Sequence, residues 1–155
     1  GNPRFLILGM GRIGSGAYDE LRAQYEGEIL GIEHKQDLVD YHHKEGRNVV
    51  QGDASDTDFW EKLDKAPNLE LVLLAMPHHV GNLFAVEQLK RLNYQGKLSA
   101  IVQYKEDADS LHESGVHSVY NLYEAAGAGF VDHVVKELLS PNGTKPDHTE
   151  KVNTP

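Results

Sequence analysis

Three glycines near the amino terminus have the spacing of a loop that binds phosphate groups. Gly9, Gly11 and Gly14 form the pattern G-x-G-x-x-G between an apolar run and a predicted helix. The pattern predicts that Gly9 makes a tight turn, that Gly11 lets backbone N–H groups approach phosphates, and that Gly14 lets the helix pack against the strand. The helix N-terminus adds free N–H donors and a partial positive charge. A purely structural glycine turn is the alternative.

Two further residues bear on which phosphate-containing ligand the loop would take. Arg12 lies inside the loop, where its guanidinium group either contacts a phosphate or forms a surface ion pair. Glu33 ends the next apolar run, about 20 residues after the loop, where an acid accepts hydrogen bonds from ribose hydroxyls. A carboxylate there repels a 2′-phosphate, so NAD or AMP is favoured over NADP. His34 and Lys35 follow it and leave NADP open, and a solvated acid is the alternative for Glu33.

Two more strand ends supply candidate adenine contacts. Asp53 follows the third apolar run and can meet the adenine amino group, while the small Ala54 leaves room for the ring. The alternative is an Asx turn that caps the next helix, and the two roles can coexist. Met76 ends the fourth run, where it packs either on adenine or ribose or in the core.

Short apolar runs alternate with helical patterns along the chain. The pattern predicts strands at 4–8, 28–33, 48–51, 69–76, 98–104 and 117–121, with helices after each, the last at 125–139. This order predicts an α/β fold, namely a Rossmann-type, doubly wound parallel sheet of six strands in three α/β/α layers. The run 69–76 is the most apolar and should be central.

Finer expectations concern the helices. Ser55 is expected to be the N-cap of the third helix. Apolar stripes predict the buried faces of the first and fourth helices, formed by Ile13, Ala17 and Leu21 and by Val80, Leu83, Phe84, Leu89 and Leu92. The last helix has two apolar rows, Phe130, Val134, Leu138 and Val131, Val135, Leu139. One row could pack on the sheet and the other on a second subunit. The alternative is a helix that packs only in the core of its own chain.

Length and composition limit the possible classes of protein. The 155 residues suit one domain, at 4–140, followed by a polar tail at 141–155 that we expect to be disordered. The net charge of −9 disfavours nucleic acid as a partner. With no cysteine, and nine histidines without metal-binding spacing, a metal site is not expected. The apolar stretch 69–77 is too short to span a bilayer. The chain begins with Gly1-Asn2, so we expect it to be part of something larger.

Four segments resemble one known family. LILGMGRIG (6–14), GIEHKQ (31–36), VVQGDASD (49–56) and LVLLAMPHH (71–79) are similar to the nucleotide-binding regulatory domain of potassium transport proteins, the TrkA-N or RCK family. The resemblance runs from Arg4 to about Leu139, and it is strongest to the cytosolic domain of Kef-type glutathione-regulated potassium efflux systems.

The resemblance implies a function. Such domains bind AMP or NAD(H) without turning it over, form homodimers, and gate a transmembrane antiporter domain, which here would lie outside this chain. It further implies a cytoplasmic domain of a bacterial inner-membrane protein, with glutathione or a glutathione adduct as a second partner. The polar tail departs from family members that add a second ligand-binding subdomain. Carried onto this chain, the ligand-binding residues are Gly9, Met10, Gly11, Arg12, Ile13, Gly14, Glu33, His34, Asp53, Ala54 and Met76.

Two enzyme classes remain as alternatives. The cofactor-binding domain of an NAD-dependent oxidoreductase would have the same loop and acid, but no substrate domain follows here to supply a catalytic group. The acids after the second and third strands also suit a methyltransferase. That class usually ends in an antiparallel hairpin, and none is visible after Val119.

Overall fold

The computed structural model describes residues 2–63 and 68–139. The chain divides into two units, residues 1–121 and 122–155, which are taken in turn below. The tail predicted at 141–155 lies outside the described residues.

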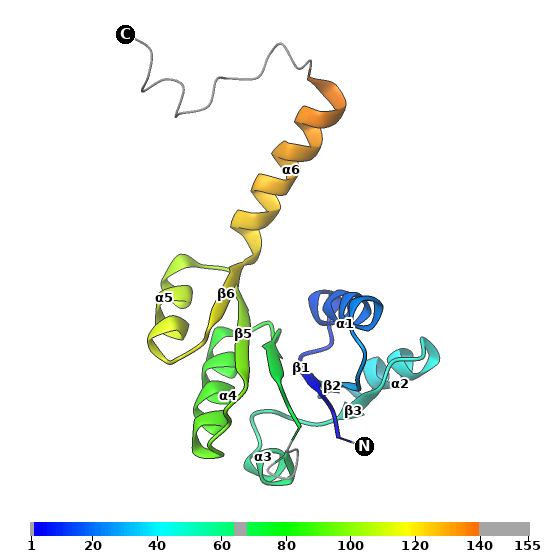
Figure 1. The fold of residues 1–155 in the computed structure, drawn as a ribbon, viewed down its shortest axis with the longest axis vertical. Coiled ribbons are helices and arrows are strands. Elements are labelled where there is room, and N and C mark those ends of the chain that lie inside the picture. Colours follow the sequence, from blue (N-terminus) through cyan, green and yellow to red (C-terminus); the bar gives the residue numbers. More distant parts are fainter. Residues whose placement is uncertain (1, 64–67, 140–155) are drawn as a thin grey trace. The chain divides into compact units, whose positions relative to one another are not determined.

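A parallel six-stranded sheet forms the centre of the first unit (Figure 1). Its order is β3-β2-β1-β4-β5-β6, so the predicted doubly wound Rossmann-type sheet is confirmed, with β4 beside β1 at the centre. All four residues of β1 are buried, as expected for a strand covered on both faces. The strands are β1 Phe5–Leu8, β2 Ile29–Glu33, β3 Val49–Gln51, β4 Leu71–Leu74, β5 Lys97–Val102 and β6 Ser118–Asn121.

Helices cover both faces of this sheet (Figure 1). Successive side chains of β1 point to opposite faces, so Phe5 and Ile7 join one core while Leu6 and Leu8 join the other. The first core includes residues of α1 and α2, and the second includes residues of α3, α4 and α5, which gives the predicted three layers. These helices are α1 Arg12–Gln24, α2 Gln36–Lys44, α3 Thr57–Leu63, α4 His79–Arg91 and α5 Lys105–Glu113.

The predicted buried faces of α1 and α4 are partly wrong. Ile13 is 40% exposed, and Gly14 and Tyr18 are the buried positions of α1. Val80 is 77% exposed, whereas Ala85, Val86 and Leu89 of α4 are buried together with the polar residues Asn82 and Gln88. The buried face of α1 is rotated from the predicted one because the first turn of the helix lies close to the glycine loop. Only a glycine, Gly14, fits at that contact.

The predicted N-cap of α3 is also wrong. The helix begins at Thr57, and the carboxylate of Asp56 accepts a hydrogen bond from the Asp58 N–H at 3.0 Å. Ser55 instead donates its hydroxyl to Asp53 at 2.6 Å. A charged carboxylate is a stronger acceptor for these N–H and O–H groups than a serine hydroxyl.

In the described part of the second unit, residues 122–139, the chain forms the helix α6, Leu122–Leu138. None of its residues is buried, and Phe130 and Leu138 are 71% and 76% exposed. The helix therefore lacks the buried face that a core helix would have in this structure. No helix among residues 2–63 and 68–139 is long and apolar enough to cross a membrane.

Candidate nucleotide site

The sheet order creates a crevice at the carboxyl ends of the strands. The chain leaves β1 toward β2 on one side, while β4 pairs with β1 on the other, so the connections diverge at this point. Ligands of doubly wound folds bind at such a switch point. Because all the strands are parallel, the loop after β1, Glu33 at the end of β2, Asp53 after β3 and Met76 after β4 meet at the same edge.

Two glycines of the loop are required by close backbone packing. Gly9 has φ +97°, and a Cβ there would lie 2.7 Å from the carbonyl oxygen of Ala75, directly after the neighbouring strand β4. A Cβ on Gly14 would collide with the carbonyl oxygen of Gly9. The turn at Gly9 and the helix–strand contact at Gly14 thus match the roles that their spacing predicts.

The third glycine faces open space. Gly11 is the N-cap residue of α1, is exposed, and has no neighbouring atom within 4 Å of where its Cβ would be. Its conformation is ordinary extended backbone, so folding does not demand glycine here. Arg12 beside it is exposed and takes part in none of the ion pairs among the described residues. The open approach and the first-turn N–H groups of α1 together suit an anion.

Glu33 is buried beneath the loop rather than solvated. Its carboxylate is 7% exposed, with Oε1 accepting the Met10 N–H at 3.2 Å and Oε2 accepting the Lys35 N–H at 2.9 Å. The exposed imidazole of His34 lies 3.2 Å from Oε2. Each carboxylate oxygen has two lone pairs, so capacity remains for ribose hydroxyls. Glu33 therefore ties the end of β2 to the glycine loop in addition to any ligand contact.

Asp53 forms the Asx turn that was the alternative to an adenine contact. Its Oδ1 accepts both the hydroxyl and the backbone N–H of Ser55, at 2.6 and 2.9 Å. These bonds, the hydroxyl bond first, hold the pKa of Asp53 below its ordinary value, with a further contribution from His34. The carboxylate is thus ionised at neutral pH, and Oδ2 faces no partner among the described residues. Ala54 is buried in the core, and its carbonyl accepts the Trp60 indole N–H at 2.7 Å.

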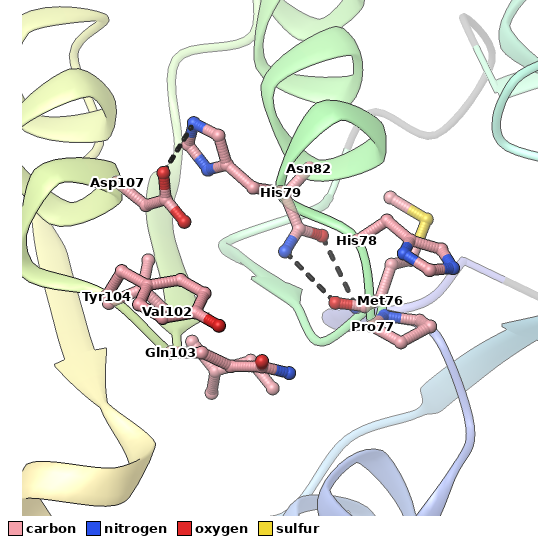
Figure 2. A pocket seen from close by; sticks show the side chains of 10 residues that line it. Met76, Pro77, His78, His79, Asn82, Val102, Gln103, Tyr104 and Asp107 are labelled. Carbon is pink, nitrogen blue, oxygen red and sulfur yellow. Dashed lines mark hydrogen bonds and ion pairs between the residues drawn. The ribbon is translucent and has the colours of Figure 1, made fainter.

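Met10 and Met76 have different surroundings. The side chain of Met10 is buried against Gly31, whose Cβ would lie 2.7 Å from the Met10 sulfur, so only its backbone can reach a ligand. Met76 is half-buried and lines a pocket of about 210 Å³ at the ends of β4 and β5 (Figure 2). The carboxyl edge therefore continues as a pocket beyond the glycine loop, and Met76 is one of its walls.

This pocket contains polar groups that the sequence analysis does not single out. Asn82 is 1% exposed, and its amide both accepts the Met76 N–H and donates to the Met76 carbonyl, at 3.3 and 3.2 Å. Figure 2 shows the His79 ring directed toward Asp107, with 3.6 Å between Nε2 and Oδ1. The Nδ1 atom of His79 is buried and has no hydrogen-bond partner among the described residues. A polar residue on an apolar helical face was the signal that could have revealed Asn82.

No group of three or more histidine or acidic residues in the described parts of the chain is arranged to hold a metal ion. A second set of polar residues does converge beneath the glycine loop. His42 is 1% exposed and lies 2.7 Å from the Met10 carbonyl oxygen, and Arg47 lies 3.2 Å from its other ring nitrogen. The sequence gives no local signal for this contact, because His42 and Met10 come from distant segments.

The class defined by this fold and this edge is a Rossmann-type nucleotide-binding domain. Residues 5–122 match the TrkA-N domain family, and the chain belongs to that family. No curated protein matches the sequence.

Solved structures share the fold. The NAD(P)-binding domain of an exopolyphosphatase-related protein from Archaeoglobus fulgidus has a TM-score of 0.76 and 20% identity over 87% of this chain and 99% of that one. The GsuK channel bound to NAD has a TM-score of 0.70 and 21% identity, covering 87% of this chain and 24% of that one. The AMP-bound C-terminal domain of Kef from Shewanella denitrificans has a TM-score of 0.67 and 23% identity, covering 86% of this chain and 80% of that one. The fold thus holds NAD in one of these proteins and AMP in another.

Proposed function

We propose that this chain is the cytoplasmic regulatory domain of a bacterial potassium efflux system, a K⁺/H⁺ antiporter, and that it binds AMP or NAD(H) to gate transport. The observation that carries the proposal is the open approach at Gly11, flanked by Glu33 and Asp53 at the ends of neighbouring strands. Phosphate, ribose and adenine contacts are needed along one edge, and these residues supply them in that order.

The charges at this edge support an adenine nucleotide with an unmodified ribose. The Glu33 carboxylate is buried at the end of β2, where a 2′-phosphate would meet a negative charge with little solvent to screen it. Asp53 is held ionised and can accept the adenine amino group through Oδ2. Arg12 is free to contact a phosphate oxygen.

Isothermal titration of the chain with AMP, NAD and NADH, and with NADP as the comparison, tests this. We expect binding of at least one of the first three and weaker binding of NADP. If none of AMP, NAD and NADH binds, the proposed function is wrong.

The gating role rests on two arrangements of a homodimer. The exposed apolar residues of α6 support a second copy of this chain as the partner that covers them. Nucleotide binding gates transport only if the ligand has different affinities for the two arrangements. A transmembrane antiporter domain and glutathione or its adduct complete this proposal. Potassium efflux from vesicles that contain the full protein should change when nucleotide is added to the domain's side, and an unchanged efflux rate would contradict gating.

We further propose that the bound nucleotide is sensed and not consumed. The alternative is the cofactor domain of an NAD-dependent oxidoreductase. Recovery of the nucleotide after prolonged incubation with the full protein distinguishes the two, since a sensor returns NADH unchanged and an oxidoreductase with its substrate converts it to NAD.

A further inference from the structure

A buried histidine on α2 contacts the backbone of the glycine loop. The Nε2 atom of His42 lies 2.7 Å from the carbonyl oxygen of Met10, in a bond that is buried. Its Nδ1 atom lies 3.2 Å from Nη1 of Arg47. Arg47 in turn donates through Nε and Nη2 to the two carboxylate oxygens of Asp19 on α1, at 3.0 and 2.9 Å. The chain of contacts therefore joins α2, the segment after it, the loop and α1.

The partners determine the protonation of the ring. A carbonyl oxygen can only accept, so the Nε2 atom of His42 must carry its proton. A guanidinium group can only donate, so Nδ1 must be the unprotonated acceptor for Arg47. His42 is accordingly neutral, with its proton on Nε2. Pairing with Asp19 raises the pKa of Arg47 and keeps the guanidinium charged.

These contacts determine the direction of the N–H groups in the loop. In a planar trans peptide the C=O and N–H groups point in opposite directions. His42 lies 2.7 Å from the Met10 carbonyl oxygen, and the Ser15 hydroxyl donates to the same oxygen at 3.4 Å. The N–H of Gly11 in the same peptide therefore points away from His42. On the other side, Glu33 holds the Met10 N–H at 3.2 Å. Two successive peptide planes are thereby oriented before a ligand arrives.

We propose that His42, oriented by Arg47 and Asp19, is a positioning residue that presents the Gly11 N–H to the nucleotide phosphate. The inference rests on the proposed function, since it assumes that the glycine loop binds phosphate. A preoriented donor needs no reorganisation when the nucleotide binds. The loss of His42 should therefore weaken nucleotide binding in a variant whose fold is otherwise unchanged.

The experiment compares neighbouring histidines on the same helix. His42→Leu removes both ring contacts. His43→Leu is the matched control, because His43 also bonds a backbone carbonyl, that of Val49 on β3 at 2.6 Å, but does not contact the loop. By titration with NAD and AMP at neutral pH, we expect His42→Leu to weaken binding about tenfold, the equivalent of one buried hydrogen bond, and His43→Leu to leave it within about twofold. Equal losses in the two variants would overturn the proposal.

A third variant keeps the proposal testable if His42→Leu does not fold. The amide of His42→Gln can donate to the Met10 carbonyl and accept from Arg47. We expect this variant to bind NAD within about twofold of the natural protein, because both ring contacts have a replacement. A folded His42→Gln variant that loses about tenfold or more in affinity would overturn the proposal. If the natural protein binds no nucleotide at all, the proposed function fails instead, so the two failures are distinguishable.

Discussion

Replacing each of three glycines of the first loop and helix by alanine should give three different outcomes. In Gly14→Ala the new methyl group collides with the carbonyl oxygen of Gly9. That oxygen cannot move away easily, because the Gly9 N–H is bonded to Ile32 at 3.0 Å and Gly9 lies against the backbone of Ala75. Overpacking against fixed backbone costs about 3 kcal/mol or more, and the helix propensity of alanine returns about 1 kcal/mol. The free energy of unfolding should therefore fall by about 2 kcal/mol or more.

The other two positions are matched controls with open space around them. Gly11→Ala has no steric conflict and an ordinary φ of −76°, so stability should change by less than about 1 kcal/mol. The methyl group would occupy the space through which a phosphate approaches the backbone, so nucleotide affinity should fall at least about tenfold. Gly16→Ala lies on the exposed face of α1 and should raise stability by about 0.8 kcal/mol without changing affinity.

Urea or thermal unfolding followed by circular dichroism, together with isothermal titration, measures both quantities for all three variants. For a chain of this size the Gly14→Ala loss corresponds to a fall in Tm of about 4–8 °C. A Gly14→Ala variant as stable as the natural protein would refute the argument from helix–strand approach. A Gly11→Ala variant that binds nucleotide normally would remove the loop backbone from the site.

Three further predictions concern charge and exposed apolar surface. Glu33→Ala should weaken nucleotide binding by about 1–3 kcal/mol in titration, while Glu28→Ala, an exposed acid before the other end of the same strand, should not; equal affinities would remove Glu33 from the site. The hydrogen bond from Arg47 holds the pKa of Asp19 below its ordinary value, so this stabilisation is present above about pH 4 and is lost as the pH falls through the lowered value. Asp19→Asn should accordingly cost about 0.5–1 kcal/mol in urea unfolding at pH 7 and less at about pH 2, and a pH-independent difference would contradict this assignment. Phe130→Asp on α6 should convert a dimer into a monomer in light scattering, and a monomeric natural protein would contradict the proposed homodimer.

Local patterns in the sequence were enough to predict the order of the helices and strands and the residues that lie at the carboxyl edge of the sheet. Strand ends can be located from apolar runs that stop at glycine or an acid, and parallel strands bring those ends together whatever the details of packing. The roles of Gly9 and Gly14 could be predicted for the same reason, because they follow from backbone geometry within one strand–turn–helix unit. Ser55 shows the limit of such reasoning, since several acceptors compete for the same N–H groups within a few residues.

Only the tertiary structure decided what lies beneath that edge. Glu33 was predicted to face a ribose, and the fold in addition bonds it to the N–H groups of Met10 and Lys35. His42 is 32 residues from Met10 in the sequence, and its contact depends on how α2 packs against β2 and β3. No local pattern encodes a distance of that kind, because it is set by the packing of side chains from four segments at once. The sequence by itself determined that the glycine loop lies at the carboxyl edge of the sheet, and the tertiary structure decided which buried groups contact that loop from other segments of the chain.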